Sequence, residues 1–407
     1  MEKKYQVSVV KKNENTLKET VKTALDLIGG LEKFVRPGQK VMIKPNYTGD
    51  LDPNEGGVTS VETQEAIIQV LNDYGIDDIT IAEGCGCVHI GTMRIFDNVG
   101  VTEMAKRYNV KLVDLNKCPT REIFDERFKE IESVKVSEGL FGYDLIINVP
   151  VIKTHAQCVA TCAVKNMKGG VAPKEKRHFH AVHLHQAIAD FNLILPKTIA
   201  IVDGIVGQEG MGPAEGDRVP LGLIIAGDNA VAVDGVVLSI MGIDPQEVKH
   251  VIYAADLGIG SYKLEDIEVL GEKIHNVRRP FRKAETDIKE YPGVEIFESN
   301  ACSGCINSLV IALNRIRGCG DLDKFKDLQL CIGTDKPKGA DYKNFFYIGK
   351  CALTNYNAEV EKHPDNVHFI AGCAPAGLEI EERIREVYGI ERSNPLYYAA
   401  AKKATDK

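Results

Sequence analysis

The stretch LIINVPVIKTH, residues 145–155, decides the fold class that the sequence predicts. Residues 145–149 form a run that is apolar except for Asn148, and the polar residues Lys153, Thr154 and His155 come soon after it. A strand that is apolar at every position is usually buried on both faces, as in parallel or mixed sheets that are covered by helices. The stretch therefore predicts an α/β fold with polar side chains at one edge of the sheet.

Similar apolar runs recur along the chain, and helix-length amphipathic segments such as Thr63–Tyr74 and His183–Leu193 lie between several of them. A second α/β pattern follows the charged stretch Gly271–Pro292. We predict an α/β domain with a large parallel or mixed sheet over residues 1–272 and a linker over 273–293. A smaller Cys-rich α/β domain over 294–392 and a tail over 393–407 complete the chain. The expected strands are Gln6–Val10, Val41–Lys44, Ile79–Ala82, Lys111–Leu115, Leu145–Val149, Thr198–Asp203, Leu221–Ala226, Val294–Phe297, Leu328–Ile332, Phe345–Ile348 and Val367–Ile370.

Composition narrows the class of protein. The 407 residues are 44% hydrophobic and 27% charged, as in ordinary soluble proteins. The formal net charge of −8 argues against nucleic acid as a partner, because phosphate binding needs a positive field. The apolar runs are strand-sized and Met1 is not followed by a signal-like apolar segment, so we expect a cytoplasmic protein without a membrane partner. In that compartment the 11 cysteines point to metal binding or catalysis and away from disulfides.

Polar residues follow several of the predicted strands in the first domain. Because strand ends of parallel sheets meet at one edge, we expect these residues to form a cleft for a carboxylate or phosphate, although a solvated charge is the commoner role of any one of them. Gly169 and Gly170 would let backbone approach the ligand closely, and no Walker pattern is present. The expected anion-binding residues are Lys44, Asn46, Glu83, Lys153, Thr154, Lys165, Asn166 and Lys168, and the expected catalytic residues are His155, His178, Asp203 and Glu209.

Further histidines and cysteines in the first domain leave their role open. His178, His180, His183 and His185 lack HExxH spacing, so catalysis or anion binding, a solvated or capping role, and metal binding all stay open. The pairs Cys85/Cys87 and Cys158/Cys162 are candidates for a second redox or metal site.

Four cysteines of the second domain follow predicted strands. Cys302 and Cys305 follow the first strand in ACSGC, Cys351 follows the third, and Cys373 follows the fourth. All four would meet at the carboxyl edge of the sheet, flanked by small residues that let backbone N–H groups approach sulfur. One CxxC with two isolated cysteines favours a [4Fe–4S] cluster over tetrahedral zinc, which more often uses paired CxxC motifs. Ordinary buried cysteines are the third alternative.

Two resemblances add to these motifs. The order ACSGC, a lone Cys351 and GCAPAG over residues 296–390 resembles the proximal-cluster module of nickel–iron hydrogenase small subunits, with Ala374 where that module has proline. This resemblance implies a flavodoxin-like fold and a [4Fe–4S] cluster on the four cysteines. The motifs KPN, AEG, NVPVIKTH, CAVKNMKGG, IVDGIVGQEGMGPAEG and GDNAVAVDGVVLSIMG over residues 38–260 resemble the family catalogued as domain of unknown function 362. Its members are commonly linked to iron–sulfur domains.

These observations together predict an iron–sulfur oxidoreductase that acts on a small anionic substrate or cofactor and exchanges electrons with a redox protein. Lys153, Lys165 and Lys168 would hold the anion, and His155 or His178 would exchange protons. Asp203 or Glu209 would orient a cation or a base. Two alternatives stay open: a non-redox binding or metallocofactor-assembly protein with a structural or sensory cluster, and a ligase- or transferase-like enzyme that binds phosphate.

Overall fold

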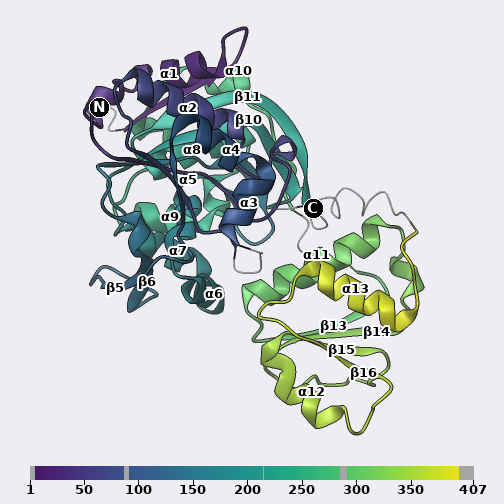
Figure 1. Cartoon of the computed structure of the whole chain (residues 1–407). Helices are drawn as coiled ribbons and strands as arrows, with labels where there is room; N and C mark the ends of the chain where they lie inside the picture. Colours follow the sequence, from purple (N-terminus) through teal and green to yellow (C-terminus); the bar gives the residue numbers. More distant parts are fainter. Residues whose placement is uncertain (1–4, 87–90, 214, 285–290, 394–407) are drawn as a thin grey trace. The chain divides into compact units, whose positions relative to one another are not determined.

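The computed structural model describes residues 5–86, 91–213, 215–284 and 291–393. The chain divides into two units, one of residues 1–179 with 183–284 and the other of residues 285–407 with 180–182. Each is an α/β unit built on its own sheet (Figure 1). The two sheets are described in turn.

The first unit is built on a mostly parallel sheet, in which ten strands pair among the described residues. Eight of them follow the order β12-β1-β11-β10-β7-β2-β3-β4, and β8 joins β10 and β9 beside this path. β10 and β11 form an antiparallel hairpin, whereas β7, β2, β3 and β4 are parallel. The strands are β1 (Tyr5–Lys11), β2 (Val41–Lys44), β3 (Ile79–Glu83), β4 (Lys111–Asp114), β7 (Leu145–Asn148), β8 (Val151–His155), β9 (Val159–Thr161), β10 (Thr198–Met211), β11 (Glu215–Gly227) and β12 (Ile267–Gly271).

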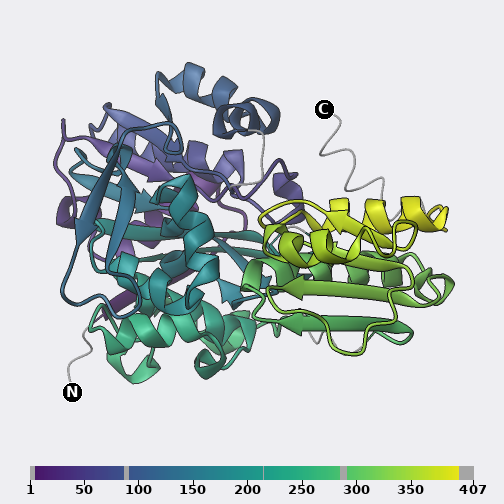
Figure 2. The ribbon, with the colours of Figure 1, turned by 90° about the horizontal axis from the view of Figure 1, so that it is seen from below.

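Helices cover this sheet, as its apolar strands require. Buried side chains of α1, α2, α3 and α4 form one core with β2, β3 and β7. α8 packs against β1 and β11 and contacts α5 and α9, and α7 also contacts α9. Figure 2 shows helices on both sides of the strands of this unit. A small antiparallel pair, β5 (Thr120–Phe124) and β6 (Ser133–Ser137), lies apart from the large sheet. The helices are α1 (Leu17–Leu27), α2 (Val61–Asp73), α3 (Thr92–Val99), α4 (Val101–Tyr108), α5 (Ala163–Asn166), α6 (Pro173–Ala181), α7 (Leu184–Asn192), α8 (Ala230–Met241), α9 (Lys249–Asp256) and α10 (Ile274–Val277).

Three neighbouring strands of the large sheet end in polar residues. β7, β2 and β3 are adjacent and parallel, and their last residues are Asn148, Lys44 and Glu83. Lys44 pairs in register with Asn148. Pro45 follows Lys44 directly, and a proline cannot donate the backbone hydrogen bond that would continue the strand. The carboxyl edge of these strands therefore collects polar side chains, as the sequence predicts.

Two segments differ from the expected elements. The hairpin of β10 and β11 extends well past the predicted runs, so Glu209 lies inside β10 and not in a glycine-rich loop. In this part of the hairpin glycine alternates with polar residues, so a prediction based on apolar runs does not detect the strands. In the predicted linker, residues 274–277 form α10, and residues up to 284 belong to the first unit.

The second unit has a four-stranded parallel sheet in the order β13-β14-β15-β16. α11 and α13 contribute Leu309, Leu313, Ile380 and Ile384 to the core on one face. α12 lies on the other face (Figure 1), where its Tyr356 packs against the core. The elements are β13 (Val294–Ser299), α11 (Ser303–Gly318), β14 (Leu328–Gly333), β15 (Phe345–Ile348), α12 (Leu353–Glu359), β16 (Val367–Ile370) and α13 (Gly377–Tyr388).

The predicted fold class is confirmed, because a large, mostly parallel sheet and a smaller parallel sheet are both present. The strand order of the smaller sheet is sequential, whereas the flavodoxin-like order exchanges the first two strands. No helix in the described part of the chain combines the length and the apolar character that crossing a bilayer would require.

Candidate functional site

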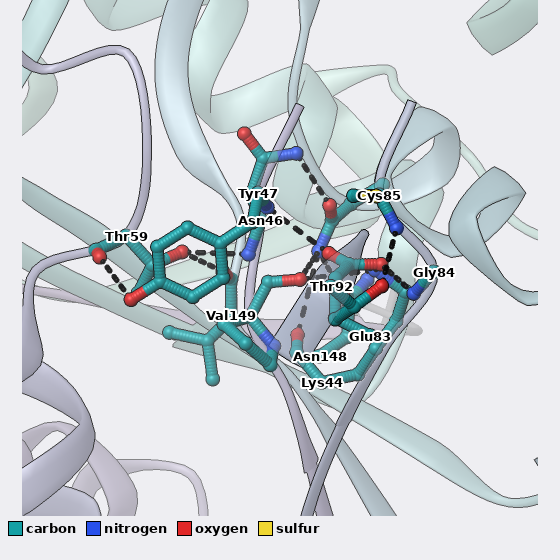
Figure 3. Close-up of polar contacts among 12 residues, drawn as sticks. Lys44, Asn46, Tyr47, Thr59, Glu83, Gly84, Cys85, Thr92, Asn148 and Val149 are labelled. Atoms are coloured by element: carbon teal, nitrogen blue, oxygen red, sulfur yellow. Dashed lines mark hydrogen bonds and ion pairs between the residues drawn. The ribbon is translucent and has the colours of Figure 1, made fainter. Parts of the chain in front are cut away.

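A buried ion pair lies at the carboxyl ends of β2 and β3. Lys44 Nζ is 2.8 Å from Glu83 Oε1 and 2.9 Å from Oε2 (Figure 3). The carboxylate also accepts the backbone N–H groups of Tyr47 at 3.0 Å and Gly84 at 2.7 Å. Burial lowers the pKa of Lys44, and the adjacent Glu83 carboxylate opposes this effect. A buried ion pair is stable only when further hydrogen bonds to both charged groups offset the cost of removing them from water.

An amide network continues from this pair. Lys153 of β8 donates from Nζ to Asn46 Oδ1 at 2.6 Å and to the Gly57 carbonyl at 2.5 Å. Asn46 donates to Asn166 Oδ1, and Asn166 donates to Asn148 Oδ1, both at 2.7 Å. All four side chains of this chain of bonds are buried. The structure therefore brings Lys153, Asn46 and Asn166 together, and it adds Asn148, which the sequence analysis did not single out.

Burial alters the acidity of Lys153. Its pKa is lowered to about 7, first by burial and then by the positive charge of Lys165, while the Glu83 carboxylate opposes the change and Lys44 adds to it. An amine with a pKa near neutral exists in both protonation states at physiological pH, which is the property of a group that can exchange a proton.

The glycine-bearing segment lies over the ion pair. A Cβ at Gly169 would lie 2.2 Å from Glu83 Oε1 and 2.9 Å from Lys44 Nζ, so only glycine fits without a shift. The segment is a short 3₁₀ helix (Met167–Gly170) that continues α5. Lys165 and Lys168 precede the glycine and are half-buried. Three lysines lie close enough in this region to interact electrostatically with one another or with Glu83: Lys44, Lys153 and Lys165. Because they outnumber the single carboxylate, their excess positive charge favours binding of an anion.

The other predicted residues bond elsewhere. Asp203 accepts from Ser60 N at 2.8 Å and Ser60 Oγ at 2.7 Å, so it holds the N-terminal end of α2. Glu209 forms an ion pair with Arg279 at 3.0 Å and accepts the backbone N–H of Arg282. These contacts give both carboxylates a structural partner.

Three further predicted side chains are also accounted for. Thr154 donates to the Gly210 carbonyl at 2.8 Å. His155 Nδ1 accepts the backbone N–H of Gln157 at 3.0 Å, and His178 is exposed on α6. His178 therefore lies on the surface and not in the buried lysine network.

A second buried group contains a residue that the sequence analysis missed. Ligand atoms of Cys158, His185 and His250 all lie within 4.8 Å of one another. His250 belongs to α9, where a lone histidine carries no spacing signal, and only its buried position beside His185 reveals it. Cys162 is not in this group, and Cys87, the expected partner of Cys85, lies outside the described residues. This Cys/His group could hold a metal ion.

The four C-terminal cysteines come together after three strands. Cys302 caps the N-terminal end of α11, Cys305 lies in its first turn, and Cys351 and Cys373 follow β15 and β16. Two backbone hydrogen bonds, Gly349 N to the Ile370 carbonyl at 2.9 Å and Lys350 N to the Gly372 carbonyl at 2.8 Å, join the last two loops.

The pKa values show that these thiols influence one another. A hydrogen bond from the Cys305 thiol lowers the pKa of Cys302 to about 5, and burial opposes this, while backbone N–H groups of the helix start add to it. The pKa of Cys305 is raised by the same hydrogen bond and by burial, and the charges of Cys302, Cys351 and Cys373 raise it further. Cys351 and Cys373 are exposed and Cys305 is buried.

Gly349 lies close to one of these thiols. A Cβ at Gly349 would lie 2.9 Å from Cys305 Sγ, so glycine at this position keeps the space beside the sulfur open. Cys331, another cysteine of this unit, packs in the core on the α12 face of the sheet, whereas Cys305 packs on the face of α11 and α13. Cys302, Cys305, Cys351 and Cys373 are therefore the thiols that come together in this unit, and their role as cluster ligands stays a prediction.

Comparisons with known proteins agree with part of the sequence analysis. The profile of the family described as "Domain of unknown function (DUF362)" matches residues 41–239, so the predicted resemblance is confirmed over this range. A thylakoid-associated protein of Synechocystis sp. is 26% identical over 250 residues, which cover 60% of this chain and 76% of that protein. The matched range includes the whole lysine network, and the C-terminal cysteines lie beyond it. The likeness of residues 296–390 to the hydrogenase module stays a prediction.

Two solved structures are similar over most of their length. A Thermotoga maritima protein has a TM-score of 0.39 at 13% identity, with 88% of this chain and 81% of that chain covered. The lactate racemase apoprotein from Thermoanaerobacterium thermosaccharolyticum has a TM-score of 0.38 at 11% identity, with 98% and 86% covered.

Proposed function

We propose that this chain is an iron–sulfur oxidoreductase that binds a small anionic substrate or cofactor in its first unit and a [4Fe–4S] cluster in its second. The observation that carries the proposal is the convergence of Cys302, Cys305, Cys351 and Cys373 at the carboxyl edge of one parallel sheet. A bound cluster would supply one-electron chemistry.

The spacing of these thiols supports a cluster over a single zinc ion. Tetrahedral zinc with sulfur ligands at about 2.3 Å brings the sulfur atoms to about 3.8 Å from one another. Among the described residues, the group whose ligand atoms all lie within 4.8 Å is that of Cys158, His185 and His250, and the C-terminal thiols do not form such a group. Cys302 and Cys305 are joined by a hydrogen bond, whereas Cys351 and Cys373 act on Cys305 by charge without one, and such unequal spacing suits a group of several atoms.

The exposure of two of these cysteines supports electron transfer over a purely structural cluster. Cys351 and Cys373 are exposed, so a cluster on this edge would lie at the surface of its unit. Electron exchange with a redox protein needs such a position, whereas a scaffold can be fully enclosed. We infer a redox protein as the partner of the second unit.

The first unit supports the anionic half of the proposal. Lys44, Lys153 and Lys165 outnumber the Glu83 carboxylate, and buried positive charge favours a carboxylate or phosphate ligand. Lys153 takes the role of proton exchange that was expected of His155 or His178, because its pKa is about 7 and it lies within the network. Asn46 and Asn166 hold the Lys153 amine in place by the hydrogen bonds described above.

Anaerobic purification tests the cluster. We expect about four iron and four sulfide per chain, an EPR signal on reduction, and the loss of both in Cys351→Ala. Cys331→Ala is the matched control, because Cys331 is in the same unit but packs on the opposite face of the sheet. A wild-type protein that binds zinc in place of iron at these thiols would refute the cluster.

Titration with small carboxylates and phosphates tests the coupling of the two halves. We expect one class of anion to change the visible absorbance or the reduction potential of the iron-loaded protein, and the change to be lost in Lys153→Met. An iron-loaded protein whose absorbance and potential respond to neither class would contradict the oxidoreductase proposal and leave the cluster assignment standing.

A further inference from the structure

The first unit contains a set of metal-ligand side chains that neither the cluster nor the lysine network uses. Cys158 lies in the connection between β8 and β9, His185 in the first turn of α7, and His250 in the first turn of α9. Their ligand atoms lie within 4.8 Å of one another, and the two imidazole rings are stacked with centroids 5.8 Å apart. Three elements far apart in the sequence thus direct soft and borderline donors to one point.

The imidazole nitrogens of this group need partners. Nδ1 of His185 and both ring nitrogens of His250 are buried and have no hydrogen-bond partner. His250 is 0% exposed. A buried polar atom without a partner costs about 1–3 kcal/mol, so such atoms in a native protein usually have a ligand, an ion or a water. An ion bound between the rings would satisfy one nitrogen of each.

The space beside His250 fits one further small ligand. A cavity of about 10 Å³ is lined by Cys162, Asp234 and His250 among others. That volume is about one water molecule. Zinc sites that keep an open position have three protein ligands and one position for a water, and here a water-sized space lies beside one of the three side chains, His250.

The charges around the group are compatible with a divalent cation. Lys165 lies close enough to act on Cys158, His185 and His250, and its positive charge opposes a bound cation. Cys158 would offset that charge once it binds the ion as a thiolate, and Asp234, whose pKa burial raises to about 7, lies at the cavity wall. Burial raises the pKa of Cys158 and Lys165 opposes this only in part, so a metal ion has to displace the thiol proton when it binds.

We propose that Cys158, His185 and His250 bind one divalent transition-metal ion of the zinc class, with its fourth position open toward the cavity lined by Cys162 and Asp234. Two nitrogens and one thiolate are the donors that zinc prefers, whereas magnesium and calcium need oxygen. Tetrahedral zinc would set the ligand atoms about 3.3–3.6 Å apart, so distances in the observed group, which are within 4.8 Å, have to contract by about 1.5 Å at most. The site does not depend on the iron–sulfur cluster.

The experiment separates this site from the C-terminal cysteines. The full chain with Cys302→Ala/Cys351→Ala, which lacks two of those thiols, is purified from zinc-supplemented cells and its zinc is measured per chain. We expect about one zinc, and its loss when Cys158→Ser, His185→Gln or His250→Asn is added. His183→Gln is the matched control, because this exposed histidine precedes the same helix but is not in the group.

Cobalt replacement gives a second readout. Cobalt(II) in the zinc-free protein should give a thiolate-to-cobalt absorption band that Cys158→Ser removes. His185→Gln decides the question if His250→Asn does not fold, because His185 is half-buried and tolerates substitution more readily. The proposal is overturned if folded His185→Gln, added to Cys302→Ala/Cys351→Ala, contains as much zinc as Cys302→Ala/Cys351→Ala alone. It is also overturned if Cys302→Ala/Cys351→Ala binds no stoichiometric metal.

Discussion

Replacing Lys153 with methionine removes a buried amine whose charge changes near neutral pH. In the folded chain the pKa of this amine is lowered to about 7, mainly by burial. In the unfolded chain a lysine has a pKa of about 10.4. Between these two values the unfolded chain binds more protons, so the free energy of unfolding of the wild type rises with pH from about 7 to about 10. Below about pH 7 the amine is protonated in both states, so it does not make the free energy of unfolding depend on pH.

The size of the effect follows from that window. Each pH unit inside it contributes about 1.4 kcal/mol, so Lys153 adds on the order of 4 kcal/mol to the rise in stability between pH 6 and pH 10. Lys153→Met lacks this rise. The variant also leaves Asn46 Oδ1 and the Gly57 carbonyl without their donor, which costs about 1–3 kcal/mol for each group at every pH.

Urea unfolding at a series of pH values between 6 and 10, followed by far-ultraviolet circular dichroism, measures this difference. The free energy of unfolding of the wild type minus that of Lys153→Met should grow by about 4 kcal/mol across the series, while contributions of other groups cancel. Lys40→Met, which removes an exposed lysine of the same unit, controls for the general loss of a positive charge. A wild-type minus variant difference that stays constant with pH would refute the assignment of a neutral-range pKa to Lys153.

Three further substitutions test the packing of both units, each by urea unfolding against the wild type. Glu83→Gln leaves the buried Lys44 charge without its partner, and we expect a loss of about 3–5 kcal/mol; a loss below about 1 kcal/mol would show that the pair carries little stability. Gly169→Ala forces a Cβ to 2.2 Å from Glu83 Oε1, and we expect a loss of about 1–3 kcal/mol, whereas unchanged stability would mean that the segment moves freely. Glu381→Gln in the second unit removes the carboxylate that accepts from three guanidinium groups at 2.7–2.9 Å. Burial raises the pKa of Glu381, but these hydrogen bonds outweigh it and lower the pKa, so its stabilisation is present above about pH 4.3 and is lost as the pH falls. We expect the variant to lose about 3–5 kcal/mol at neutral pH and less in acid, and a loss that is independent of pH would contradict this account.

The sequence alone was enough to locate most of the strands and the edge where polar side chains collect. The runs Val41–Lys44 and Phe345–Ile348 are strands with the predicted bounds, because a buried parallel strand is apolar at consecutive positions and that signal is local. The predicted Lys44, Asn46, Glu83, Lys153 and Asn166 lie in one network for the same reason: parallel strands that end at one edge bring their next residues together.

Only the tertiary structure decided which polar residues share a partner. Asp203 and Glu209 follow the same sequence pattern as Glu83, yet they bond to Ser60 and Arg279, because the hairpin of β10 and β11 carries them to other neighbours. Nor does any spacing relate His250 to Cys158. Their approach depends on how α7 and α9 pack, and packing between distant segments leaves no periodic trace in the sequence.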